Sequence, residues 1–324
     1  MKILFCDEGY SEARTRLADE LPDAEIVAAP RDRVRQHLAG VNVVVPYMAR
    51  IGETIINAGT FGLIQQFGVG LESVDVEAAT RAGVWVARVP SGDTGNAESV
   101  AEHALFLMLA LARRFPQSQR ELRAGRLGEP AGLALAGKTV CIIGVGAAGS
   151  ALALRLHALG MHLIAVRKNV RGALPSAVPF ASVFAVCDLA QAVAHADFVV
   201  VTARYERDAH HLLDATILSA AKQGAYIVNV ARGGFVDTDA LAAALRSGRI
   251  AGAGLDVVEN EPIAHDHSLM ALDVIVTPHI AGVTDRSYVG IAHEVAENVR
   301  RFARGDAPRH AVNNPRAVRG APVA

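Results

Sequence analysis

Short apolar runs alternate with helix-like segments along almost the whole chain, four before residue 90 and six after residue 137. The runs are KILFC, NVVVP, LIQQF and VWVAR in the first part, then KTVCIIG, HLIAV, DFVVVT, AYIVNV, AGAGLDV and DVIVTP in the second. Continuous apolar runs of this length are typical of strands buried on both faces. Because they alternate with helices, we expect right-handed crossovers and parallel sheets, and the pattern predicts an α/β fold.

Two joins divide this pattern into two α/β units. The turn-rich segment RVPSGDTGN runs into an Ala/Leu-rich helix predicted over about 97–114. A second join lies near PHIAG, residues 278–282, after six strands that already complete a doubly wound sheet. The last helix, about 284–304, is therefore expected to return to the first unit. We predict a dinucleotide-binding domain over residues 105–281 and a smaller domain formed by residues 1–104 and 282–324.

The composition suits this architecture and narrows the classes of function. A chain of 324 residues is long enough for about two domains, and 51% of it is hydrophobic with a mean hydropathy of +0.26. The formal net charge of -1 produces no overall field that favours nucleic acid or an anionic membrane. The most apolar helix-like run, ALFLMLALA, is far shorter than the roughly 20 residues that span a bilayer. We expect neither nucleic acid nor membrane as a partner.

The amino terminus and the cysteines point to the same compartment. MKILFCDEGYSE turns acidic early and contains no apolar core of signal-peptide length. Cys6, Cys141 and Cys187 all lie in apolar surroundings and show no metal-ligand spacing. We expect a cytoplasmic protein with buried, reduced thiols and no metal site.

A glycine-rich turn follows the strand KTVCII. Gly144, Gly146 and Gly149 have the G-x-G-x-x-G spacing, with an apolar strand before them and an Ala/Leu helix after them. In this context the glycines allow a tight turn, close approach of the backbone to a pyrophosphate, and close packing of helix on strand. The alternative is a strand-to-helix turn that binds nothing. The context favours a dinucleotide site.

The next strand, HLIAV, ends where such folds carry an acid that binds the ribose 2′-hydroxyl of NAD. This chain has Arg167 and Lys168 there instead. Arginine can donate two hydrogen bonds to a phosphate and lysine adds a point charge. The alternative is a pair of solvated surface cations. We interpret the pair as a 2′-phosphate site and expect NADP to be preferred to NAD.

Several further motifs together resemble the D-isomer-specific 2-hydroxyacid dehydrogenase family, in particular glyoxylate and hydroxypyruvate reductases. They are FGVGLESVDVEAATRAGV, GNAESVAEHAL, GVGAAG, NVARGGFVDTDAL, GAGLDVVENEP and TPHIAG, and they cover about residues 40–300 in the family's order. The resemblance implies two doubly wound parallel-sheet domains, a Rossmann cofactor domain and a smaller flavodoxin-like substrate domain. We expect the two to close over a cleft that excludes water from the hydride path.

The resemblance also implies catalytic roles. Arg232 would clamp the substrate carboxylate and polarise its carbonyl, His279 would exchange the proton, and Glu261 would be the acid beside it. The chemistry independently favours these residue types. A carboxylate suits a guanidinium, and the alkoxide that forms when hydride reaches a 2-oxo carbon needs a proton that histidine can supply near neutral pH. A nearby carboxylate stabilises the charged imidazole and orients it.

Binding residues are implied in the same way. Val69 and Gly70 would hold the substrate carboxylate through backbone N–H groups, and Asn96 matches a polar position close to the substrate in the formate-oxidising branch. Asp256 would contact the nicotinamide carboxamide. Ala147 and Ala148 replace the family's commoner Arg-Ile pair, so that pyrophosphate binding would depend on backbone N–H groups.

Other positions depart from the family's pattern. Arg204 stands where many members have proline, and it would either approach the cofactor phosphates or be exposed. Leu127 stands where many members have tryptophan. This replacement would enlarge the substrate pocket or alter what the partner chain contributes to that pocket. His210 and His211 are adjacent, and since helical or strand geometry would point them apart, we assign them no site.

The predicted reaction is the reversible reduction of a small 2-oxo acid, glyoxylate or hydroxypyruvate by preference, to the D-2-hydroxy acid with NADPH or NADH. One alternative is another hydride donor such as formate, but that branch has glutamine at the position of Glu261. A second alternative is a non-enzymatic NAD(H)-sensing corepressor or interaction module on the same fold, which the complete set of Arg232, Glu261 and His279 disfavours. We expect a homodimer built around residues 97–125, although ALFLMLALARRF could equally be buried within one chain.

Overall fold

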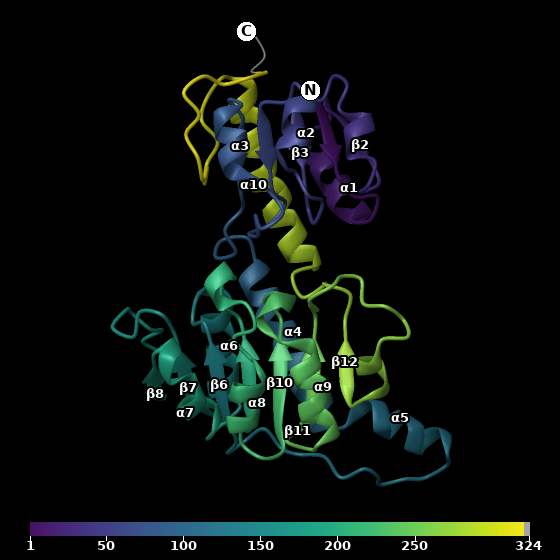
Figure 1. Ribbon diagram of the computed structural model, residues 1–324, viewed down its shortest axis with the longest axis vertical. Coiled ribbons are helices and arrows are strands. Elements are labelled where there is room, and N and C mark those ends of the chain that lie inside the picture. Colours follow the sequence, from purple (N-terminus) through teal and green to yellow (C-terminus); the bar gives the residue numbers. More distant parts are fainter. Residues whose placement is uncertain (321–324) are drawn as a thin grey trace. The chain divides into compact units, whose positions relative to one another are not determined.

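The computed structural model describes residues 1–320, and its backbone divides into two compact units. The first unit comprises Met1–Asn96 and the segment that begins at Asp285, and the second comprises Ala97–Thr284. The last long helix, α10, therefore belongs to the first unit (Figure 1). No helix among residues 1–320 combines the length and the apolar character that crossing a membrane requires.

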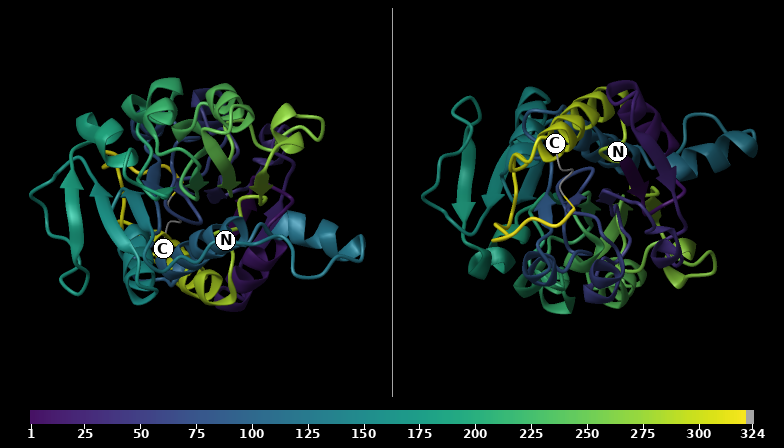
Figure 2. Two further views of the ribbon diagram at one scale, coloured as in Figure 1. Left: turned by 90° about the horizontal axis from the view of Figure 1, so that it is seen from below. Right: turned by 90° about the horizontal axis from the view of Figure 1, so that it is seen from above.

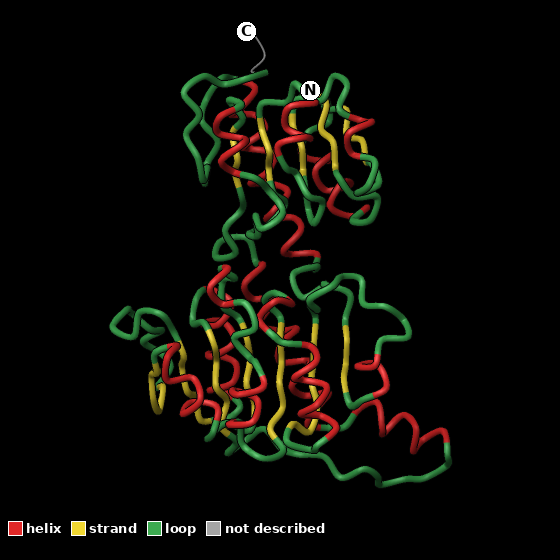
Figure 3. Tube along the Cα trace, in the orientation of Figure 1, coloured by secondary structure: helices red, strands yellow, loops and turns green. Residues whose placement is uncertain are grey.

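The first unit is a five-stranded parallel sheet with helices on both faces (Figures 1 and 3). Its strand order, β2-β1-β3-β4-β5, is that of a flavodoxin-like doubly wound sheet. Its elements in chain order are β1 (Lys2–Phe5), α1 (Ser11–Glu20), β2 (Glu25–Ala28), η1 (Val34–His37), β3 (Val43–Val45), α2 (Glu53–Ala58), β4 (Leu63–Gln65), α3 (Val76–Arg81), β5 (Trp85–Ala87) and α10 (Asp285–Ala303).

The second unit is a seven-stranded parallel sheet in the order β12-β11-β10-β9-β6-β7-β8. The six strands β8-β7-β6-β9-β10-β11 have the Rossmann order 3-2-1-4-5-6 when they are numbered from β6, and β12 is one further strand beside β11. Its elements are α4 (Asn96–Ala112), α5 (Phe115–Arg123), β6 (Thr139–Ile143), α6 (Ala147–Ala158), β7 (His162–Val166), β8 (Phe180–Phe184), η2 (Val186–Asp188), α7 (Leu189–Val193), β9 (Phe198–Val201), η3 (Arg207–Ala209), α8 (Ala215–Ala220), β10 (Ala225–Asn229), η4 (Gly233–Phe235), α9 (Thr238–Arg246), β11 (Ile250–Leu255), η5 (Ser268–Ala271) and β12 (Val274–Val276).

Each sheet has a hydrophobic core on both faces, because successive residues of a strand point to opposite sides. In β6, Cys141 and Ile143 pack with α7, α8 and α9, whereas Val140 and Ile142 pack with α4 and α6. The first unit repeats this arrangement, with α1 and α10 on one face and α2 and α3 on the other. Figure 2 shows the helices on either side of the second sheet. The predicted α/β class with two parallel sheets is confirmed.

Two strands and one thiol differ from the sequence prediction. The sequence analysis does not predict strands β2 and β8, which both lie at sheet edges and contain no buried residue. Cys6 and Cys141 are buried, and burial raises the pKa of the Cys141 thiol to about 12. The prediction that Cys187 is buried is wrong, because it lies in the exposed short turn before α7.

Candidate active site

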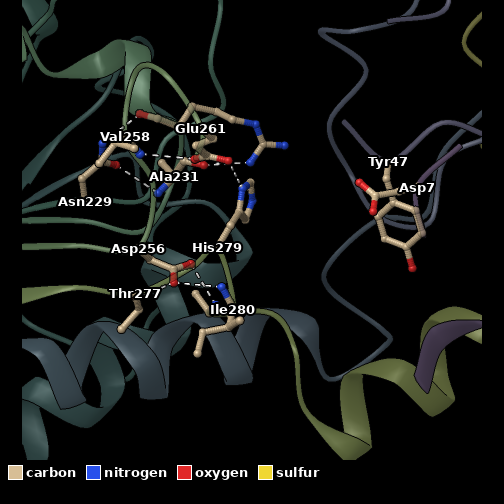
Figure 4. Close-up of polar contacts among 12 residues, drawn as sticks. Asp7, Tyr47, Asn229, Ala231, Asp256, Val258, Glu261, Thr277, His279 and Ile280 are labelled. Carbon is tan, nitrogen blue, oxygen red and sulfur yellow. Dashed lines mark hydrogen bonds and ion pairs between the residues drawn. The ribbon is translucent and has the colours of Figure 1, made fainter. Parts of the chain in front are cut away.

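His279 and Glu261 form the central polar contact of the second unit (Figure 4). Nδ1 of His279 lies 2.8 Å from Oε2 of Glu261, and the two side chains are 28% and 21% exposed. Both residues lie in loops that follow strands, Glu261 after β11 and His279 after β12. The carboxyl ends of parallel strands all lie at the same end of a sheet, so the loops that follow the neighbouring strands β11 and β12 lie close together.

The protonation of Glu261 decides which atom of the histidine ring can act. Burial works to raise the pKa of Glu261, but the hydrogen bond and charge of His279, the N–H of Val258 and the charge of Arg232 together lower it. An ionised carboxylate only accepts hydrogen bonds, so the proton of this contact lies on Nδ1 of His279. The other ring nitrogen, Nε2, is then available to exchange a proton with a substrate.

Arg232 is positioned by the loop that leaves β10. The buried side chain of Asn229 donates from Nδ2 to the carbonyl of Arg232 (2.8 Å) and accepts from the N–H of Ala231 (3.1 Å). The guanidinium donates to the carbonyl of Ala231 and adds its charge to the environment of Glu261. Three of the residues predicted from sequence, Arg232, Glu261 and His279, are therefore brought together at one edge of the second sheet.

Asp256 is almost fully enclosed, with its side chain 1% exposed. Its Oδ1 accepts from the hydroxyl of Thr277 (2.6 Å) and the N–H of Ile280 (2.9 Å), and its Oδ2 accepts from the N–H of Ala281 (2.8 Å) (Figure 4). The N–H of His279 also donates to the backbone carbonyl of Asp256. Asp256 thus shapes the loop that carries His279, and its contact with a nicotinamide carboxamide stays a prediction.

The glycine loop has the geometry that a dinucleotide pyrophosphate requires. Gly144 has φ of +92°, and a Cβ there would lie 2.4 Å from Cα of Ala203. A Cβ on Gly149 would lie 2.2 Å from the carbonyl oxygen of Gly144, so only glycine allows α6 to pack this closely on the strand. The start of α6, with Gly146 as its cap and Ala147 as its first residue, is exposed. Its free N–H groups can therefore meet an anion.

Arg167 and Lys168 directly follow β7, but both already have partners. The guanidinium of Arg167 donates to the carbonyls of Gly172 and Ala173 within its own loop. The ammonium of Lys168 lies 2.6 Å from Oε2 of Glu206 and 2.9 Å from Oδ2 of Asp208, and these contacts raise the pKa of Lys168. A 2′-phosphate would have to compete with these acids, which sequence reasoning missed because they lie about 40 residues further along the chain.

The predicted substrate loop of the first unit is held by a residue that sequence reasoning did not single out. Val69 and Gly70 follow β4 in the segment that begins with Gly68 at φ of +142°. The buried amide of Gln66 donates to the carbonyls of Gly70 and Tyr47 and accepts from the N–H of Phe67. The available signal was a pair of glutamines ending an apolar strand, where a buried amide needs specific partners.

The remaining predicted positions lie in different surroundings. Asn96 is the first residue of α4 and still belongs to the first unit, where its amide donates to the hydroxyl of Ser287 in the same unit. Arg204 is exposed, which is one of the two environments expected for it. Leu127 is 84% exposed in the loop after α5 and therefore takes no part in the core of its own unit.

Comparison with known families matches the second unit. The family described as "D-isomer specific 2-hydroxyacid dehydrogenase, NAD binding domain" matches residues 105–281. A glyoxylate reductase from Thermococcus litoralis is 32% identical over 291 residues, which are 87% of this chain and 85% of that protein. A D-3-phosphoglycerate dehydrogenase from Archaeoglobus fulgidus is 35% identical over 277 residues, 84% of this chain and 51% of that protein. The chain spans about half the length of such phosphoglycerate dehydrogenases.

The fold of this chain also matches that of solved structures. The crystal structure of a D-lactate dehydrogenase from Aquifex aeolicus, complexed with NAD and lactic acid, superposes with a TM-score of 0.82 at 25% sequence identity. The match covers 97% of this chain and 100% of that one.

Proposed function

Because the chain belongs to the D-isomer-specific 2-hydroxyacid dehydrogenase family, we propose that it reduces a small 2-oxo acid to the D-2-hydroxy acid with a nicotinamide cofactor. Glyoxylate and hydroxypyruvate are the preferred substrates of this proposal, supported by the similarity to a glyoxylate reductase. The contact of 2.8 Å between His279 and Glu261 carries the proposal, because formate oxidation needs no group that exchanges a proton with the substrate.

In this proposal the residues of the second unit divide the chemistry among themselves. Arg232 binds the substrate carboxylate through charge-assisted hydrogen bonds and draws electron density from the neighbouring carbonyl. His279 delivers the proton from Nε2 to the carbonyl oxygen as negative charge develops there. Glu261 accepts the hydrogen bond from Nδ1, which orients the ring and stabilises its charged form.

The cofactor would be held by the glycine loop, whose close approaches at Gly144 and Gly149 and exposed helix start fit a pyrophosphate. Gly146, Ala147 and Ala148 would supply backbone N–H groups, and Arg167 and Lys168 would meet a 2′-phosphate. When bound, the nicotinamide supplies or accepts the hydride.

Steady-state assays test the proposed reaction. The purified chain is assayed with NADH and with NADPH against glyoxylate, hydroxypyruvate, pyruvate and a phosphorylated 2-oxo acid, and in the oxidative direction against formate. Turnover of the unphosphorylated 2-oxo acids supports the proposal. Turnover of formate, or absence of turnover with every compound together with tight binding of a protein partner, would instead support one of the alternatives.

The substitution Glu261→Gln should move the pH profile of reduction towards lower pH. Because the pKa of Glu261 is lowered, its carboxylate stays charged at neutral pH in the unchanged chain and accepts the hydrogen bond from Nδ1 of His279. Glutamine removes that negative charge, which would otherwise stabilise a positively charged imidazole, so we expect the alkaline limb of the pH profile to move to lower pH. At a pH on the alkaline limb, we expect the rate of the variant, divided by its own plateau rate, to be about tenfold lower than the same ratio in the unchanged chain. A tenfold change corresponds to a charge-assisted contact of about 1.5 kcal/mol.

The pH dependence of kcat/KM measures this effect, with Asp266→Asn, which changes an exposed acid of the same loop, as the matched control. A profile of Glu261→Gln that coincides with that of the unchanged chain would reject the proposed role of Glu261.

We further propose that NADPH is preferred to NADH. The preference in kcat/KM should be about ten-fold to a few hundred-fold, since Arg167 and Lys168 would attract the 2′-phosphate while exposure, salt and the competing acids Glu206 and Asp208 weaken that attraction. Because Glu206 and Asp208 hold Lys168, the double variant Glu206→Gln with Asp208→Asn should increase the preference. Arg167→Asp with Lys168→Ala should raise the KM for NADPH far more than that for NADH.

These variants are compared at two salt concentrations, with Arg246→Ala as a control for the loss of an exposed cation elsewhere on the second unit. Equal or better kcat/KM with NADH in the unchanged chain would show that the two cations are only a solvated strand end.

We also propose that the chain forms a homodimer through α4 and α5. Phe106 and Leu109 on α4, Phe115 and Leu122 on α5, and Leu127 just beyond are exposed in the described chain. Because these side chains follow one another on consecutive elements, we propose that they form one contiguous apolar patch, which is typical of an interaction surface. Light scattering at micromolar concentration should give twice the mass of 34.1 kDa, and a monomeric mass would remove this proposal.

A further inference from the structure

Two adjacent histidines in the loop between β9 and α8 turn the same way. The expectation that His210 and His211 point apart is wrong, because His211 adopts the left-handed conformation with φ of +53°. Their rings stack with centroids 3.8 Å apart and planes inclined by 24°. A left-handed backbone is uncommon outside glycine and persists only where the surroundings hold it, often at functional sites.

Glu259 faces both rings from the loop after β11. Its Oε1 lies 2.8 Å from Nε2 of His211 and 3.7 Å from Nε2 of His210, and one ligand atom from each of the three residues lies within 4.8 Å of the others. A tetrahedral zinc ion at about 2.0–2.1 Å from each ligand needs ligand atoms about 3.3 Å apart. The two distances to Glu259 lie on either side of that value, so small side-chain movements would complete the geometry.

Each histidine also has a polar group at its other ring nitrogen. Nδ1 of His210 lies 3.0 Å from the hydroxyl of Tyr205, and Nδ1 of His211 lies 3.8 Å from Oδ2 of Asp237. Asp237 is itself fixed, because its Oδ1 accepts from the N–H of Ala240 at the start of α9. Metal-binding histidines typically have such a partner at the nitrogen that does not bind the metal, where it orients the ring.

We propose that His210, His211 and Glu259 bind a divalent transition-metal ion of the zinc class. Two imidazoles and one carboxylate suit Zn²⁺, Co²⁺, Ni²⁺ and Cu²⁺, whereas Mg²⁺ and Ca²⁺ prefer oxygen ligands. The three side chains are partly exposed, so an ion can enter from solvent and keep water at its fourth position. The bound ion would join the loop after β9 to the loop that also carries Glu261, and this site does not depend on the proposed reaction.

Calorimetric titration tests the site. The untagged chain is freed of metal with a chelator, then titrated with Zn²⁺ and separately with Mg²⁺. We expect one Zn²⁺ per chain, no binding of Mg²⁺, and a rise in melting temperature with Zn²⁺. Co²⁺ should give visible absorption bands that Zn²⁺ abolishes.

Variants locate the ion. His210→Ala, Glu259→Gln and His211→Asn should each weaken Zn²⁺ binding at least about tenfold, and asparagine suits the left-handed backbone of His211. Asp237→Asn keeps the helix cap but removes the charge, and should weaken binding about 10–100-fold. His195→Ala, an exposed histidine of the same unit, is the matched control. Zinc binding that is absent, or that is equal in the control and in the His210 and Glu259 variants, would overturn the proposal.

Discussion

Replacing His279 with alanine should lower kcat by roughly 10²–10⁴-fold, the contribution expected of a positioned proton donor. Nδ1 of His279 lies 2.8 Å from Oε2 of Glu261, and the backbone N–H of His279 donates to the backbone carbonyl of Asp256. The ring position is therefore set by contacts that do not involve the cofactor. Cofactor affinity should therefore stay near that of the unchanged chain. Single-turnover and steady-state rates, with cofactor binding followed by fluorescence, measure the two effects separately.

A second substitution at the same position distinguishes loss of the proton donor from misfolding of the variant. His279 has φ of +57°, a conformation that asparagine adopts more readily than alanine. His279→Asn should show the same loss of kcat, because an amide cannot deliver a proton. His157→Ala, on the exposed end of α6, should leave kcat unchanged. If the His279 variants keep more than a tenth of the original kcat, another group supplies the proton.

Replacing Arg232 with alanine should lower kcat/KM by roughly 10²-fold or more, with a higher KM and a lower kcat together. A hydrogen bond to a charged group contributes about 1.5–3 kcal/mol, and a guanidinium can donate two such bonds to a carboxylate. KM rises because the substrate carboxylate loses its partner, and kcat falls because the carbonyl is no longer polarised or aligned. The backbone of the loop should persist, since the amide of Asn229 binds the carbonyl of Arg232 and not its side chain.

Arg232→Lys separates charge from geometry. Lysine keeps the positive charge but cannot donate two parallel hydrogen bonds, so it should recover only part of the substrate affinity. Arg249→Ala, which removes a guanidinium near the opposite end of β11, is the control. A loss in Arg232→Ala confined to kcat, with KM unchanged, would contradict a role in binding the carboxylate.

The limits of sequence reasoning are clearest in the strands. β3 and β9 are entirely buried, and their unbroken valine-rich runs are sufficient to predict strands from the amino-acid sequence. β2 and β8 lie at sheet edges, and each includes an exposed residue: Glu25 in β2, and Ala181 and Ser182 in β8. The other two edge strands, β5 and β12, contain no exposed residue and were predicted, so the edge strands that the sequence analysis missed are those whose burial is interrupted.

The sequence by itself determined the α/β class, the glycine loop and the three short motifs that contain Arg232, Glu261 and His279. Each of these is recognised from residues that are neighbours in the chain. Tertiary structure decided how distant loops meet: the pairing of Lys168 with Glu206 and Asp208, and that of His211 with Glu259. It also decided the left-handed turn that stacks His210 on His211. Periodicity reports which face of an element is buried, whereas these contacts depend on loop conformations that only the packed sheet selects.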